Sequence, residues 1–136
     1  MGYHDISLTL SPDLPVWPGD PQIEFELTSD MAAGAKANIT RIALSVHTGT
    51  HLDAPLHFIR DGGDVTALAL ETLIGPAQLV DAKDAAVIDA TVLDSLSIPD
   101  DTERLLIKTR NSQLWSEARA DFCTEFVSVT ESGAVW

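Results

Sequence analysis

The alternation of apolar and polar side chains predicts several short strands. Residues 5–10 and 22–28 both alternate with a period of two, which is typical of a strand that buries one face. In the second segment this period places Ile23, Phe25 and Leu27 on one side of the strand. We expect these three side chains to face inward.

A further strand is predicted at residues 39–47. Ile42, Leu44 and Val46 share one face of this segment, and His47 lies at its end on the opposite face. The strand is therefore expected to bury an apolar face and to present His47 where the chain leaves it.

The remaining pattern mixes helices, strands and one irregular segment. Residues 77–82 and 105–109 have the composition of strands, and residues 91–96 between them favour a helix. Thr130 has the side chain of a helix N-cap and precedes the final residues of the sequence. Four prolines within residues 11–21 predict a stiff loop, because proline lacks the N–H that regular structure needs.

The length and composition favour one folded domain. The chain has 136 residues, of which 45% are hydrophobic, and it contains no repeat, low-complexity tract or linker. We therefore predict a single α/β domain over residues 1–136.

The charge balance argues against two classes of partner. The chain carries 21 Asp and Glu against 8 Lys and Arg, a formal net charge of −13. This excess repels phosphate backbones and anionic membrane surfaces, so we expect no nucleic acid and no membrane as partner.

The termini and the single cysteine add little chemistry. The first residues lack the basic start and apolar run of a signal peptide, so a cytoplasmic protein is expected. No apolar run approaches the roughly 20 residues that span a bilayer. Cys123 cannot form an intrachain disulfide, and its mixed surroundings without a nearby histidine favour a packed thiol over a nucleophile.

Candidate chemistry concentrates in one segment, because three of the four histidines lie within residues 47–57. Gly49 allows a tight turn, so His47 and His51 can face one point in space. His51 and Asp53 are two residues apart, which places them on the same side of an extended segment. Two imidazoles and a carboxylate suit Zn²⁺, Mn²⁺ or Fe²⁺, and three protein ligands leave a position for water.

Such a site would support hydrolysis. A metal ion lowers the pKa of bound water from about 15.7 to about 7 and polarises a carbonyl oxygen. His57, which follows Pro55, need not bind the same metal. With an ordinary pKa of about 6.5, its imidazole is suited to take a proton from water and deliver it to a leaving nitrogen.

Structural roles are the alternative for each residue taken alone. A histidine at a strand end is commonly a polar residue with its hydrogen bonds satisfied, and Asp53 could form a turn. Trp17, on the proline-rich loop, either plugs the core or forms one wall of a pocket, and composition alone favours the plug. The histidine cluster as a whole favours metal binding.

The sequence also resembles a known family. The run of residues 47–58, HTGTHLDAPLHF, is similar to the signature of the metal-dependent cyclase family, which includes bacterial kynurenine formamidase and isatin hydrolase. Further similar segments are residues 17–20, 73–77, 107–112 with Trp115, and 130–136. The resemblance implies a swivelling β/β/α fold with a mixed β-sheet, hydrolysis of small amides or lactams, and frequently a homodimer.

The resemblance also implies roles for individual residues. His47, His51 and Asp53 would be metal ligands, and His57 would be the proton shuttle. Trp17 would line the substrate pocket, which replaces the interpretation of this residue as a plug.

One departure from the family pattern changes the expected metal content. Family members continue for several tens of residues and supply another histidine and a glutamate as ligands. This sequence has no histidine after His57, and Glu125 and Glu131 precede the place where the missing glutamate should occur. We therefore expect a cyclase-like domain whose C-terminal part is missing, with one Zn or Mn ion per chain.

Three functions remain open at this stage. The first is an active hydrolase of a small amide or lactam, for which an aromatic amide such as N-formylkynurenine is the substrate that the family suggests. The second is an inactive family member that binds metal or a small ligand, and the third is an assembly module without metal. Loss of the C-terminal part would expose apolar surface and strand edges, so we expect a homo-oligomer, a dimer or higher.

Overall fold

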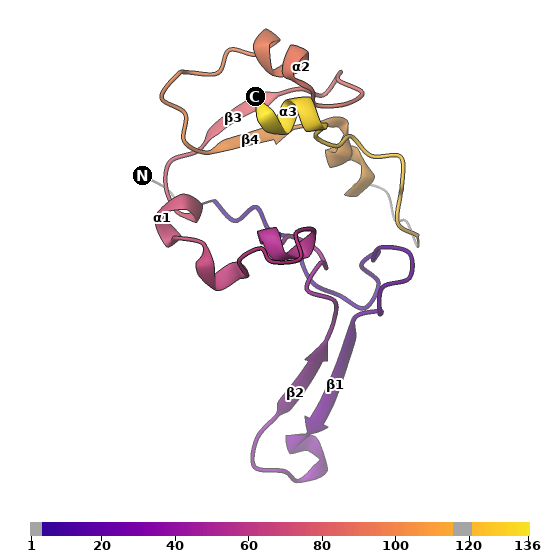
Figure 1. Ribbon diagram of the computed structural model, residues 1–136. Helices are drawn as coiled ribbons and strands as arrows, with labels where there is room; N and C mark the ends of the chain where they lie inside the picture. Colours follow the sequence, from indigo (N-terminus) through magenta and orange to yellow (C-terminus); the bar gives the residue numbers. More distant parts are fainter. Residues whose placement is uncertain (1–3, 116–120) are drawn as a thin grey trace. The chain divides into compact units, whose positions relative to one another are not determined.

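The computed structural model describes residues 4–115 and 121–136, which divide into two compact units (Figure 1). The first unit comprises Met1–Asp53 with Ala120–Phe122, and the second comprises Ala54–Arg119 with Cys123–Trp136. The prediction of one domain over the whole chain remains a prediction. No helix within the described ranges is long and apolar enough to cross a membrane.

The first unit is built on a β-hairpin. Strand β1 (Glu24–Ser29) pairs antiparallel with β2 (Ile39–Ala43), and the short 3₁₀ helix η1 (Met31–Ala33) lies between them. The strands pair with Phe25 opposite Ile42 and with Glu26 opposite Arg41. Directly opposed residues share a face, so the hairpin has one apolar and one charged side.

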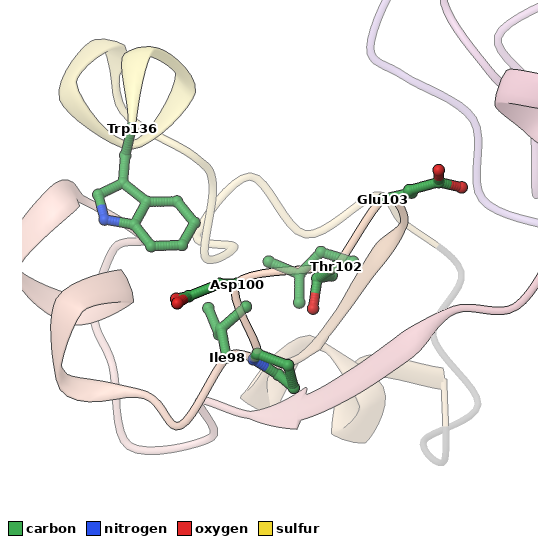
Figure 2. Close-up of a pocket in the computed structure, with 7 residues that line it drawn as sticks. Ile98, Asp100, Thr102, Glu103 and Trp136 are labelled. Atoms are coloured by element: carbon green, nitrogen blue, oxygen red, sulfur yellow. The ribbon is translucent and has the colours of Figure 1, made fainter.

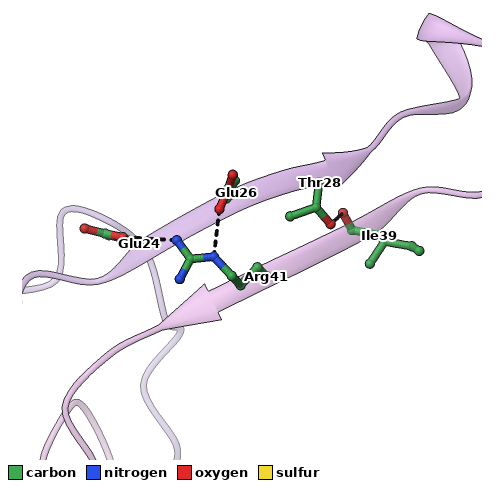
Figure 3. A network of polar contacts seen from close by, with 5 residues as sticks. All are labelled: Glu24, Glu26, Thr28, Ile39 and Arg41. Atoms are coloured by element: carbon green, nitrogen blue, oxygen red, sulfur yellow. Dashed lines mark hydrogen bonds and ion pairs between the residues drawn. The ribbon is translucent and has the colours of Figure 1, made fainter. Parts of the chain in front are cut away.

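The charged side is held by Arg41. Its guanidinium lies 2.7 Å from the Glu26 carboxylate and 3.5 Å from that of Glu24 (Figure 3). All three side chains are more than half exposed, so each ion pair stabilises the hairpin by less than about 1 kcal/mol.

The apolar side of the hairpin differs from the prediction. Ile23, which precedes β1, is buried, but Phe25 and Leu27 are 41% and 52% exposed. Alternation determines which side chains share a face, whereas burial needs a second layer over that face. The prediction that Phe25 and Leu27 face inward was therefore wrong.

Two other predicted strands also differ. Residues 5–10 belong to neither sheet, and the backbone N–H of Leu8 donates to Thr50 Oγ1 over 2.9 Å instead of joining a strand ladder. Strand β2 ends at Ala43, so His47 lies in the turn beyond the strand and not at its end. The described strands form two separate two-stranded sheets, one antiparallel and one parallel, in place of the expected mixed sheet.

The second unit contains the parallel sheet. Strand β3 (Gln78–Asp81) pairs with β4 (Leu105–Lys108), and the connection between them carries α2 (Ala90–Ser95). These three elements confirm the strands and the helix predicted there. Parallel neighbours need such a crossover connection, because a tight turn cannot join them.

The core of the second unit lies where this crossover meets the last part of the chain. Its buried members are Ala82, Ile88, Leu93 and Val127. Helix α3 (Glu131–Val135) begins after Thr130, whose Oγ1 accepts the N–H of Gly133, as the N-cap prediction required. The Thr130 N–H donates to the Ile88 carbonyl, which ties the start of α3 to the core.

Short helices complete the second unit (Figure 1). They are the 3₁₀ helices η2 (Pro55–His57), η3 (Val65–Ala67) and η4 (Arg110–Trp115), and the α-helix α1 (Leu70–Leu73).

One side chain in η4 substitutes for a strand partner. Asn111 Nδ2 donates to the Val127 carbonyl, and Asn111 Oδ1 accepts the Val127 N–H, both over 2.8 Å. Val127 is 5% exposed, so water cannot replace these bonds without cost.

We expect Asn111→Ala to lower the free energy of unfolding by about 2 kcal/mol, because it leaves two buried backbone groups unpaired. Urea denaturation measures the change. Ser95→Ala is the control, since it removes only an exposed hydroxyl that donates to the Val92 carbonyl, and it should change stability by less than about 0.5 kcal/mol. Equal, small effects of both substitutions would contradict the assigned role of Asn111.

Candidate metal centre

The predicted ligands follow β2 in a compact turn that begins at Ser45. The hydroxyl of Ser45 accepts the backbone N–H of His47, and its carbonyl accepts that of Thr48, each over 3.2 Å. Both groups of one serine therefore fix the backbone that carries His47. Sequence reasoning did not identify Ser45, although its hydroxyl two residues before His47 is a known turn-forming arrangement.

Gly49 then reverses the chain. Its φ is +64°, in the left-handed region that costs a residue with a side chain about 1–2 kcal/mol. A Cβ at this position would also lie 3.1 Å from Leu10 Cδ2 and 3.3 Å from Leu14 Cδ2. The turn thus needs glycine both for its backbone conformation and for the packing of the N-terminal segment against it.

The next residue anchors the same segment. Thr50 Oγ1 accepts the N–H of Leu8, which joins residues 42 positions apart in the sequence. The motif turn is therefore held from two directions, by Ser45 before it and by the N-terminal segment beside it.

This turn brings His47, His51 and Asp53 together. Each offers one ligand atom, and these atoms lie within 4.8 Å of one another. His47 Nδ1 is 2.8 Å from Asp53 Oδ1, and His51 Nε2 is 3.6 Å from the same oxygen. The two imidazole rings stand edge to face, with their centroids 5.4 Å apart.

The donor set fits a divalent cation. Two imidazole nitrogens and a carboxylate oxygen are ligands that zinc and manganese both accept. The side chains of both histidines are 30% exposed and that of Asp53 is 43% exposed, so water can reach the group. Within the described ranges this is the one group of three or more potential metal ligands, and it includes neither Glu125 nor Glu131.

The other two predicted site residues lie outside this group. Trp17 is 49% exposed, and its ring meets that of Phe122 edge to face with centroids 5.2 Å apart, so Trp17 is not a buried plug. His57 ends η2 in the second unit, and its ring lies 4.0 Å from that of Phe58 between centroids. Their proposed roles in substrate binding and proton transfer remain predictions.

The second unit also contains an open hollow of about 350 Å³ (Figure 2). The residues that line it are Ile98, Pro99, Asp100, Thr102, Glu103, Leu105 and Trp136. The indole Nε1 of Trp136 donates to Asp94 Oδ1 over 2.7 Å, which fixes the ring at one side of the hollow. None of the predicted site residues lines it.

Comparison with known proteins finds one matching family model and several similar proteins. The family model described as "Putative cyclase" matches residues 4–136. The chain is 40% identical over 139 residues to Cyclase-like protein 3 of Arabidopsis thaliana, covering 98% of this chain and 51% of that protein. It is also 40% identical over 119 residues to a kynurenine formamidase of Erythrobacter litoralis, covering 87% of this chain and 54% of that protein.

A solved structure agrees with these relatives. A predicted metal-dependent hydrolase from Bacillus stearothermophilus superposes with a TM-score of 0.71 at 30% identity, covering 96% of this chain and 60% of that one. The chain spans about half the length of the curated relatives it matches. Since the family model covers all but the first three residues, the chain belongs to the cyclase family.

Proposed function

We propose that this chain is a metal-dependent hydrolase that cleaves the C–N bond of a small amide or lactam. The observation that carries the proposal is the convergence of His47, His51 and Asp53 in one turn that water can reach. Relatives named kynurenine formamidase support an amide as the substrate class, and a solved neighbour described as a predicted metal-dependent hydrolase supports metal-dependent hydrolysis.

The proposed cofactor is one zinc or manganese ion per chain. His47, His51 and Asp53 would hold it, and they would leave coordination positions for water or substrate because the protein supplies three ligands. When bound, the cation supplies a Lewis acid for the amide carbonyl and for water.

The chain's own residues would supply the proton transfers. In the proposed reaction the oxygen of water bonds to the carbonyl carbon, and the bond from that carbon to nitrogen breaks. His57 takes the proton that water loses and delivers a proton to the leaving nitrogen, so the products are a carboxylic acid and an amine. Trp17 would offer an aromatic wall to the acyl or aryl part of the substrate.

A second candidate is a family member without turnover that binds metal or a small ligand, or that serves in assembly. The observation that favours it is that the group of potential metal ligands among the described residues contains three side chains and includes neither Glu125 nor Glu131. The two candidates differ in whether a bound metal supports hydrolysis.

We expect the chain purified without chelator to contain about one equivalent of zinc or manganese, and His51→Ala to lose it, because two ligands hold a metal more weakly than three. Elemental analysis per chain measures this. His57→Ala is the matched control and should retain the metal. Absence of metal in the wild-type chain, even after supplementation, would falsify the proposed cofactor.

We expect His57→Ala to lower kcat on formamides or isatin-like lactams by about 100-fold or more, which is the contribution of a general acid–base group. Steady-state kinetics of metal-loaded protein checks this, and His4→Ala is the control at an exposed histidine outside the motif. Wild-type turnover that survives in His57→Ala would exclude the proton-shuttle role. Metal content without any wild-type turnover would favour the second candidate.

We propose that the chain forms a homo-oligomer, a dimer or higher. The half-exposed apolar side chains of the hairpin, Phe25, Leu27 and Ile42, support this, because contiguous apolar surface commonly marks an interface. Light scattering should give the mass of at least two chains, and Leu27→Lys should lower it. The mass of one chain in dilute solution would exclude the oligomer.

A further inference from the structure

The ring of His51 has a hydrogen bond that fixes the position of its proton. His51 Nδ1 lies 2.9 Å from the backbone carbonyl oxygen of Gly49. A carbonyl oxygen can only accept, so Nδ1 must carry the hydrogen in this contact. In a neutral imidazole the other nitrogen, Nε2, then has the lone pair.

This lone pair faces another acceptor. His51 Nε2 lies 3.6 Å from Asp53 Oδ1, an oxygen that also lies 2.8 Å from His47 Nδ1. No proton stands between Nε2 of the neutral ring and the carboxylate. Two acceptor atoms at this separation repel each other, and a cation shared by both removes the repulsion.

The direction of the Gly49 carbonyl depends on its left-handed backbone. With φ at +64°, the turn brings the carbonyl of Gly49 back onto the side chain two residues later. Two interactions hold the segment in this form. Leu10 and Leu14 pack against Gly49, and the N–H of Leu8 donates a hydrogen bond to Thr50 Oγ1.

We propose that Gly49 is a positioning residue: its carbonyl holds His51 in the Nδ1–H tautomer and thereby presents Nε2 to the metal. The inference rests on the proposed function for the identity of the ligand. The tautomer itself is a property of the chain without metal, and metal-binding histidines are commonly oriented by a bond from the other ring nitrogen.

The first experiment needs no metal and no substrate. Long-range ¹H–¹⁵N correlation spectra of the metal-free chain at about pH 8, above the ordinary imidazole pKa of about 6.5, report the protonated nitrogen of each neutral ring. We expect the Nδ1–H form for His51. His4, which is exposed and for which the structure records no ring hydrogen bond among the described residues, should show the Nε2–H form that an imidazole in water prefers.

The second experiment perturbs the turn and measures affinity for Zn²⁺ alone. Gly49→Ala and Gly49→Asn introduce the same Cβ against Leu10 and Leu14, but asparagine adopts the left-handed conformation more readily than alanine. We expect Gly49→Ala to lose the Nδ1–H preference and to bind Zn²⁺ about 10- to 100-fold more weakly. Gly49→Asn should retain more of both properties, and circular dichroism verifies that each variant is folded.

The outcomes separate this inference from the proposed function. An Nε2–H tautomer of His51 in the wild-type chain overturns the role of Gly49 even if zinc binds. An Nδ1–H tautomer without zinc binding overturns the proposed cofactor, and the role of Gly49 as a positioning residue with it. If Gly49→Ala does not fold, the wild-type spectrum and the wild-type zinc titration still decide both questions.

Discussion

The candidate metal centre depends on a single backbone reversal at Gly49. Ser45 fixes the chain before this reversal with two hydrogen bonds, and the left-handed φ of Gly49 returns it toward the side chain of His51. Without the reversal, His47 and His51 would be separated by the length of an extended segment. The backbone conformation of this short turn therefore brings three potential ligand atoms within 4.8 Å of one another.

Packing from a distant part of the sequence supports this turn. A Cβ at position 49 would lie 3.1 Å from Leu10 Cδ2 and 3.3 Å from Leu14 Cδ2, and the N–H of Leu8 donates to Thr50 Oγ1. The N-terminal segment belongs to neither sheet, yet it limits the conformations open to the motif. Because its backbone N–H and C=O groups are not paired in a sheet, they can form hydrogen bonds with side chains. The hydrogen bond from the N–H of Leu8 to Thr50 Oγ1 is one example.

The second unit is stabilised by a different set of interactions. A β-α-β crossover provides a small core, and the amide of Asn111 gives the buried backbone of Val127 the two bonds that a neighbouring strand would otherwise supply. The N–H of Ile88 donates to the Ser128 carbonyl and the Ile88 carbonyl accepts the N–H of Thr130, which extends this connection to the start of α3. Residues far apart in the sequence are thus joined by a few directed hydrogen bonds around a core of four buried side chains.

The sequence by itself determined the local elements with strong signals and the three residues of the candidate metal-binding group. The strands β3 and β4, the helix α2 and the Thr130 cap follow from apolar runs and capping chemistry, which act over a few residues. The grouping of His47, His51 and Asp53 follows from spacing and from a glycine between them. Only the tertiary structure decided the exposure of Phe25 and Leu27 and the contacts that fix the turn at Gly49. It also decided that β2 ends before His47 and that residues 5–10 do not form a strand. The physical reason is that periodicity specifies which side chains share a face, whereas burial and strand pairing depend on partners that the folded chain brings from elsewhere in the sequence.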